Sequence, residues 1–122
     1  MIFVEFETPE PFAVGQEVHG AVTWDPEGVT RGRGFRLSVD WRTEGRGDRN
    51  RATVLTVEKP FTHGQPTTLT RFPFVFRLPT EGPVTYHGRL LRVLWSVTAR
   101  IDIGWALDPS VTRDFVVAPR LL

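Results

Sequence analysis

Alternation of apolar and polar residues is clearest between Gly88 and Trp105. From position 91 onward every odd position in this stretch is apolar, and most positions between them are polar. This period of two predicts a β-strand with one buried and one solvated face. Some apolar residues also fit helical spacing, but the β-branched content favours a strand. Because it would span roughly 50 Å if straight, we expect this strand to bend or bulge.

Shorter alternating segments on both sides of this stretch predict further strands. They cover residues 2–7, 18–24, 35–42, 52–59, 68–78 and 111–117. Pro73 predicts an edge position or a bulge, because proline cannot donate a hydrogen bond to a neighbouring strand. Residues 43–51 are polar and predict a wide hairpin loop. The buried face of 52–59 stays open, since Val54, Leu55 and Val57 occupy both phases.

Many short strands separated by Gly and Pro residues predict an all-β fold, an antiparallel sandwich of about seven to eight strands. We expect one domain over residues 1–119 and a short tail over 120–122. All four tryptophans fall on the inward phase of their strands, which predicts core packing and disfavours a platform for stacking sugars. They are Trp24, Trp41, Trp95 and Trp105.

Composition narrows the classes of protein that fit. The net charge of +1 disfavours a nucleic-acid partner, and the absence of cysteine excludes disulfides and cysteine-based metal sites. The first residues are acidic and interrupted by proline, which argues against a signal peptide. No apolar window is long enough to span a membrane. We therefore expect a cytoplasmic protein.

Candidate catalytic residues are few. Histidines and serines lie in separate segments without the spacing of a metal site or a strained nucleophile turn. They are His19, His63 and His87, and Ser38, Ser96 and Ser110. We expect no enzyme activity, no metal and no cofactor.

Arginines gather around the predicted hairpin loop, at Arg42, Arg46, Arg49 and Arg51, and further arginines lie at the entry of the neighbouring strand, at Arg31, Arg33 and Arg36. Such a cluster predicts a contact with an anionic group or a partner, and its alternative is a solvated, mobile hairpin. At the other end of the chain, Leu121 and Leu122 are apolar and follow the last predicted strand. We expect them to contribute to the edge of a homodimer.

Two motifs resemble the arrestin-fold family. The first is FAVGQEVHGAV (12–22), in which Gly15 is expected at positive φ. The second is FPFVFRLP followed by GPVTYHGRLLRVLWSVTARID, within residues 72–102. Their order and spacing are similar to those of arrestins, the arrestin-like retromer subunit and bacterial sporulation-control proteins. The resemblance implies an immunoglobulin-like β-sandwich, and the family usually carries two such domains in tandem.

Fold resemblance and the lack of catalytic residues together predict a non-enzymatic protein-interaction or scaffold module with a protein partner. The alternative is a ligand-binding module for carbohydrate or anionic groups. Because this sequence supplies one sandwich where the family pairs two, we also expect a homodimer.

Overall fold

The computed structural model describes residues 1–25, 32–45, 50–61, 69–88, 91–102 and 109–119. These segments form ten β-strands and no helix. The strands are β1 (Ile2–Phe6), β2 (Phe12–Ala13), β3 (Glu17–Trp24), β4 (Gly34–Gly45), β5 (Arg51–Pro60), β6 (Thr70–Arg77), β7 (Tyr86–His87), β8 (Leu91–Asp102), β9 (Ser110–Phe115) and β10 (Val117–Ala118). Since β2, β7 and β10 have two residues each, seven longer strands build the fold, and the predicted all-β class is confirmed.

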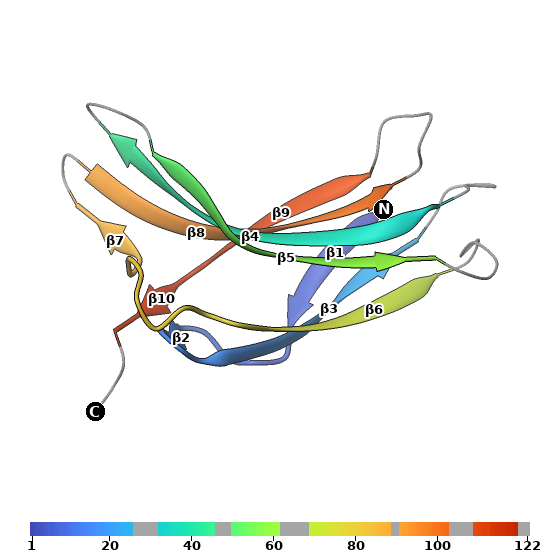
Figure 1. The fold of residues 1–122 in the computed structure, drawn as a ribbon, viewed down its shortest axis with the longest axis horizontal. Helices are drawn as coiled ribbons and strands as arrows, with labels where there is room; N and C mark the ends of the chain where they lie inside the picture. The colour runs from blue at the N-terminus through green and yellow to red at the C-terminus, as the bar shows by residue number, and fades with distance from the viewer. Residues whose placement is uncertain (26–31, 46–49, 62–68, 89–90, 103–108, 120–122) are drawn as a thin grey trace.

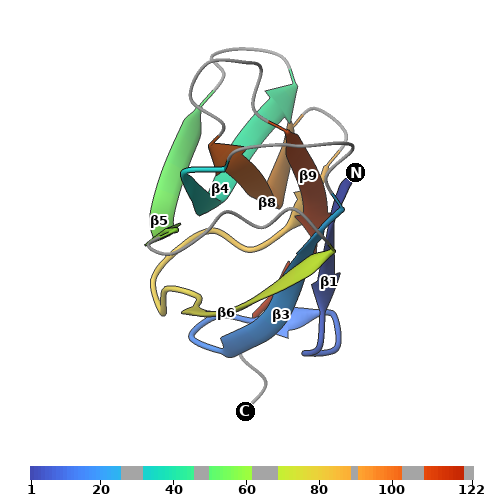
Figure 2. The ribbon, with the colours of Figure 1, turned by 90° about the vertical axis from the view of Figure 1, so that its right-hand side faces the viewer.

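Two antiparallel sheets pack face to face (Figures 1 and 2). The three-stranded sheet has the order β1-β3-β6. The five-stranded sheet has the order β5-β4-β8-β7, and β9 also pairs with β8. The short strands β2 and β10 pair in parallel beside the sandwich. Pro73 lies in β6, at an edge of its sheet, as predicted.

The long alternating stretch forms β8, and its inward residues are the centre of the core. Trp95, Val97, Ala99 and Ile101 are each at most 1% exposed. The sandwich does not cover the start of the strand, where Leu91 is 42% exposed, so the expected inward position of Leu91 was wrong. Residues 103–105, including Trp105, lie outside the described residues.

Trp41 differs from the other described tryptophans. Trp24 and Trp95 are buried, whereas Trp41 is only partly buried and packs against the margin of the core. Its strand continues past the three-stranded sheet, and Figure 1 shows that end of β4 rising away from the lower layer. An inward phase alone therefore does not give Trp41 full burial.

A β-bulge in β5 explains the mixed phase of its apolar residues. Val39 pairs with Leu55, but the next residue, Asp40, pairs with Thr53, so Val54 is the extra residue. An extra residue reverses the alternation on one side of it. Apolar residues of both phases can therefore face the core from the same strand.

The hairpin and the final strand differ from their predicted bounds. β4 continues to Gly45 and β5 begins at Arg51, so part of the predicted loop is strand. The predicted strand 111–117 divides at Val116 into β9 and β10, which lie in different sheets. Gly15 has a φ of 75°, as expected for its turn.

Candidate functional site

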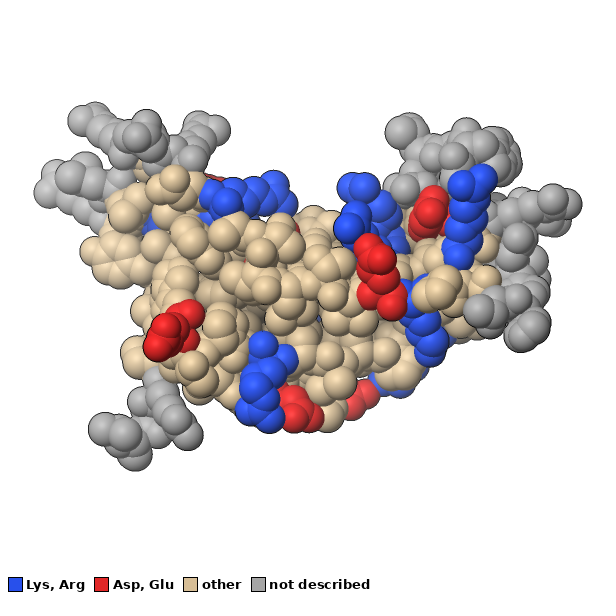
Figure 3. Space-filling model, in the orientation of Figure 1, with Lys and Arg blue, Asp and Glu red and all other residues tan. Residues whose placement is uncertain are grey.

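The outer face of the five-stranded sheet is concave. Figure 1 shows this sheet bowed, with both ends of β8 rising away from the three-stranded sheet. Figure 3 shows basic side chains on both sides of the lower middle part of this face. We call this concave outer face the trough. Its side chains come from the polar phase of each strand, because the apolar phase faces the core.

Hydroxyl groups form the floor of the trough. Register places one hydroxyl residue on each of four neighbouring strands, in a single row across the sheet. The row consists of Thr56 on β5, Ser38 on β4, Thr98 on β8 and Thr112 on β9. The hydroxyls of Thr98 and Thr112 lie 3.0 Å apart and share a hydrogen bond.

A hollow of about 220 Å³ lies on this floor, and we call it the hydroxyl pocket. Two arginines and four hydroxyl residues line it: Arg36, Arg100, Ser38, Thr53, Thr56 and Thr98. Arg36 and Arg100 are direct cross-strand partners on β4 and β8. Like charges directly opposite each other destabilise a sheet. The placement of Arg36 opposite Arg100 therefore does not stabilise the fold by itself.

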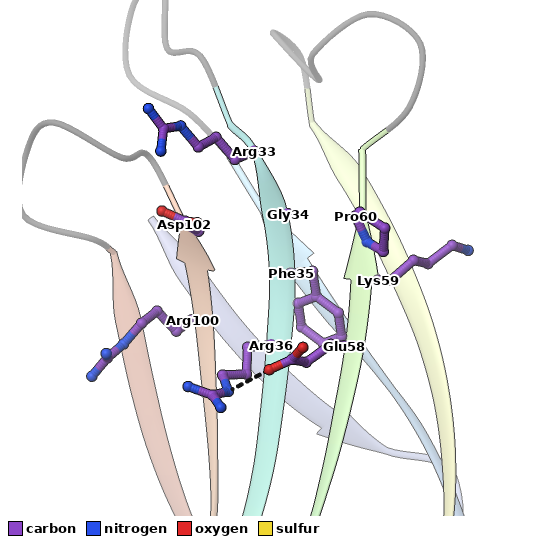
Figure 4. A pocket seen from close by; sticks show the side chains of 9 residues that line it. All are labelled: Arg33, Gly34, Phe35, Arg36, Glu58, Lys59, Pro60, Arg100 and Asp102. Atoms are coloured by element: carbon purple, nitrogen blue, oxygen red, sulfur yellow. Dashed lines mark ion pairs between the residues drawn. The ribbon is translucent and has the colours of Figure 1, made fainter.

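A larger cavity of about 440 Å³ continues from the hydroxyl pocket toward the Asp102 end of β8, and the two share Arg36 and Arg100 (Figure 4). Glu58 also lines this cavity, and its carboxylate is 3.0 Å from Nε of Arg36. In the same view Lys59 extends away from the arginines. Arg100 makes no ion pair with any described residue. We call this part of the trough the basic end.

The opposite end of the trough carries matched charges, and we call it the balanced end. Asp40 is 3% exposed there, accepts a 2.6 Å hydrogen bond from Oγ1 of Thr53, and pairs with Arg51 at 3.2 Å. Arg92 pairs with Glu44 at 2.6 Å. The arginines at this end therefore have carboxylate partners.

Arg42 joins this network through Glu44 at 3.1 Å and Asp114 at 3.4 Å. Partial burial acts to lower the pKa of Arg42, but its hydrogen bonds to the two carboxylates and their charges outweigh that effect and raise the pKa above its usual value. Arg42 is therefore charged at every pH at which proteins ordinarily fold.

The predicted arginine cluster falls at the balanced end. Arg42 and Arg51 are direct cross-strand partners, as expected for two sides of one hairpin. Arg46 and Arg49 lie outside the described residues, as do Leu121 and Leu122. The loop-centred prediction did not include Arg100. The outward phase of Arg36 and Arg100 was visible in the sequence, but only the β4–β8 register places them side by side.

Other candidate chemistry stays dispersed in the described part of the chain. No three His, Asp or Glu side chains there are grouped closely enough to hold a metal ion. His19 is exposed and lies 2.7 Å from Glu17, and His63 is outside the described residues. None of the described segments forms a helix with the length and apolar character needed to cross a bilayer.

Comparisons with known proteins bear on the fold. No protein-family model matches the chain, and no curated protein does. Among solved structures, the chain is similar to Spo0M, a sporulation control protein from Bacillus subtilis, with a TM-score of 0.76 and 25% sequence identity. The similarity covers 95% of this chain and 48% of Spo0M, so the chain spans about half the length of that protein. The fold is arrestin-like, as the two sequence motifs predicted.

Proposed function

We propose that the chain is a non-enzymatic interaction module that binds a protein partner in the trough. The observation that carries this proposal is the hydroxyl pocket, in which two adjacent arginines stand over a hydroxyl floor on a concave face. The fold similarity to a protein named for sporulation control supports a regulatory rather than a catalytic role. Partner contacts also offer a reason for keeping two like charges side by side.

A substitution that fills the trough tests this proposal. Thr98→Tyr places a ring on the half-buried floor of the hydroxyl pocket. Thr23→Tyr is the matched control, because Thr23 is also half-buried and lies on the outer phase of β3 in the other sheet. We expect affinity capture from the native host to lose its partner with Thr98→Tyr and keep it with Thr23→Tyr, at equal thermal midpoints. Equal capture by both variants would place the partner elsewhere.

Anion binding is the form of the alternative ligand-binding function that the structure favours. The hydroxyl pocket supplies positive charge and hydrogen-bond donors. Carbohydrate platforms have less support among the described tryptophans, because Trp24 and Trp95 are buried and Trp41 packs against the core. Anion binding and partner binding are the same function if the anionic group belongs to the partner protein.

The expected homodimer and the expected cytoplasmic location both remain predictions. The edge strands β1 and β9 lie against each other, and Arg113 on β9 donates a 2.8 Å hydrogen bond to the carbonyl of Val4. A dimer contact is therefore expected away from these two edges, and residues 120–122 are the sequence-based candidate. Light scattering at micromolar concentration tests it, since a constant mass of 13.9 kDa would contradict a dimer. Cell fractionation tests the location.

A further inference from the structure

The hydroxyl pocket has a lining that contains donors and positive charge but no carboxylate side chain. We propose that it binds a carboxylate side chain presented by an acidic segment of the partner protein. This inference rests on the proposed function and specifies which group of the partner the trough recognises. Three features of the pocket carry it: its unused donors, its net charge and its continuity with the neighbouring cavity.

Several donors in the pocket are unused within the described part of the chain. Thr53 donates to Asp40, and Thr98 shares its hydroxyl with Thr112. By contrast, the hydroxyls of Ser38 and Thr56 and the guanidinium of Arg100 have no hydrogen-bond partner among the described residues. A bound oxyanion would satisfy these groups, because ionised acceptors form the stronger hydrogen bonds with guanidinium donors.

The charge of the two pocket arginines and the carboxylate that contacts one of them matches a single bound carboxylate. Arg36 and Arg100 contribute two positive charges, and Glu58 at the rim neutralises one through its 3.0 Å contact with Arg36. One positive charge of these three side chains is left without a partner. A phosphate dianion would place more negative charge beside Glu58 than a carboxylate does. A monoanion restores neutrality and removes the repulsion between the two arginines.

The dimensions suit a side chain held on an extended segment. Adjacent strands lie about 4.8 Å apart, so a carboxylate can bridge guanidinium groups from β4 and β8 while it accepts from the hydroxyls beneath. The pocket is continuous with the 440 Å³ cavity through the shared arginines, and the trough is open to solvent above. A peptide chain can therefore pass over the pocket and continue along the basic end.

Peptide binding to the full chain tests the proposal. The probe is a fluorescent peptide in which Glu alternates with Gly, with a Gln–Gly peptide of the same length as its uncharged match. The key variant is Arg100→Gln, and the control is Arg92→Gln, which removes the same charge from the outer face of the same strand at the balanced end. Fluorescence anisotropy at low ionic strength gives the dissociation constants.

We expect the Glu peptide to bind and the Gln peptide not to bind. Arg100→Gln should weaken binding roughly tenfold, the loss expected for one charge-assisted contact, and Arg92→Gln should change it less than about twofold. Ser38→Ala should weaken it by roughly threefold without altering net charge.

Three results would overturn the proposal. Equal weakening by Arg100→Gln and Arg92→Gln would indicate general electrostatic attraction. Equal binding of the Glu and Gln peptides would exclude carboxylate recognition. Much tighter binding of a phosphoserine peptide, lost in Arg100→Gln, would assign the pocket to a dianion. If any of these occurs while Thr98→Tyr still abolishes partner capture, the proposed function survives and only the carboxylate assignment fails.

Discussion

The two ends of the trough lie on the same strands, but their arginines differ in how many carboxylate partners they have. At the balanced end Arg42, Arg51 and Arg92 all pair with carboxylates, and Asp40 among them is buried. At the basic end Arg36 has one acidic partner and faces Arg100 across the sheet. The same residue type therefore supports the fold at one end and carries unused charge at the other.

This difference separates stability from binding. An arginine that already pairs with a carboxylate stabilises the fold. It has few free hydrogen-bond donors and little uncompensated charge with which to bind a ligand. Charges that repel each other in the free protein cost stability, and a ligand of opposite charge removes that cost. Substitutions at the balanced end should therefore reduce stability and spare binding, and substitutions at the basic end should do the reverse.

The largest effect is expected beneath the trough, in the core that supports both ends. Trp95→Ala should destabilise the protein by about 3–5 kcal/mol, because it removes a large side chain that is 1% exposed. Leu91→Ala on the same strand is the control and should cost less than about 1 kcal/mol. Urea unfolding measures both. A loss below about 1 kcal/mol for Trp95→Ala would contradict the inward phase of β8.

The next largest loss of stability is expected for an aspartate at the balanced end, and an aspartate at the basic end should show almost none. Asp40→Ala should cost about 2 kcal/mol, because it removes a buried carboxylate and leaves the Thr53 hydroxyl without its 2.6 Å acceptor. Asp102→Ala, at the exposed basic end, should change stability by less than about 0.5 kcal/mol. Similar losses for both variants in urea unfolding would mean that the ends do not differ in structural role.

A smaller loss is expected for an arginine at the balanced end. Arg42→Gln removes contacts with Glu44 and Asp114 and should lower stability by about 0.5–1 kcal/mol. Affinity for the Glu peptide should stay within about twofold of the wild type. Calorimetry and anisotropy on the same sample check the two values. A large loss of peptide affinity would move the binding site toward the balanced end.

The smallest effect has the opposite sign. Arg100→Gln should raise stability by about 0.2–0.5 kcal/mol, because it removes the repulsion from Arg36 on the neighbouring strand. The thermal midpoint should rise slightly while peptide affinity falls. A lower midpoint would show that Arg100 is a structural residue and that its repulsion is compensated within the fold.

Strand phase could be read from the sequence wherever both sheets are present. The inward positions of β3, β6 and most of β8 follow directly from their alternation, and Trp95 and Phe74 are buried as that pattern requires. The prediction fails in two places: Leu91 and Trp41 are not fully buried despite their inward phase, and the bulge at Val54 reverses the phase of β5. Local patterns carry no information about how far the opposite sheet extends.

The candidate site needed information that a local pattern lacks. Arginines close in sequence, such as Arg42 and Arg51, suggested a cluster, and they do lie together. Arg36 and Arg100 are far apart in the chain, and only the pairing of β4 with β8 makes them neighbours. The same register assembles the hydroxyl floor from four strands. Sequence spacing therefore found the arginines around the hairpin and missed Arg100, which has no ion pair with any described residue.

Chemical-shift mapping tests the central claim most directly. The ¹⁵N-labelled protein is titrated with the Glu peptide, and each amide reports its own surroundings. We predict that the largest perturbations occur at Arg36, Ser38, Thr98 and Arg100, which surround the hydroxyl pocket. Perturbations concentrated at the balanced end, or on β1, β3 and β6, would contradict the assignment of the basic end as the binding site.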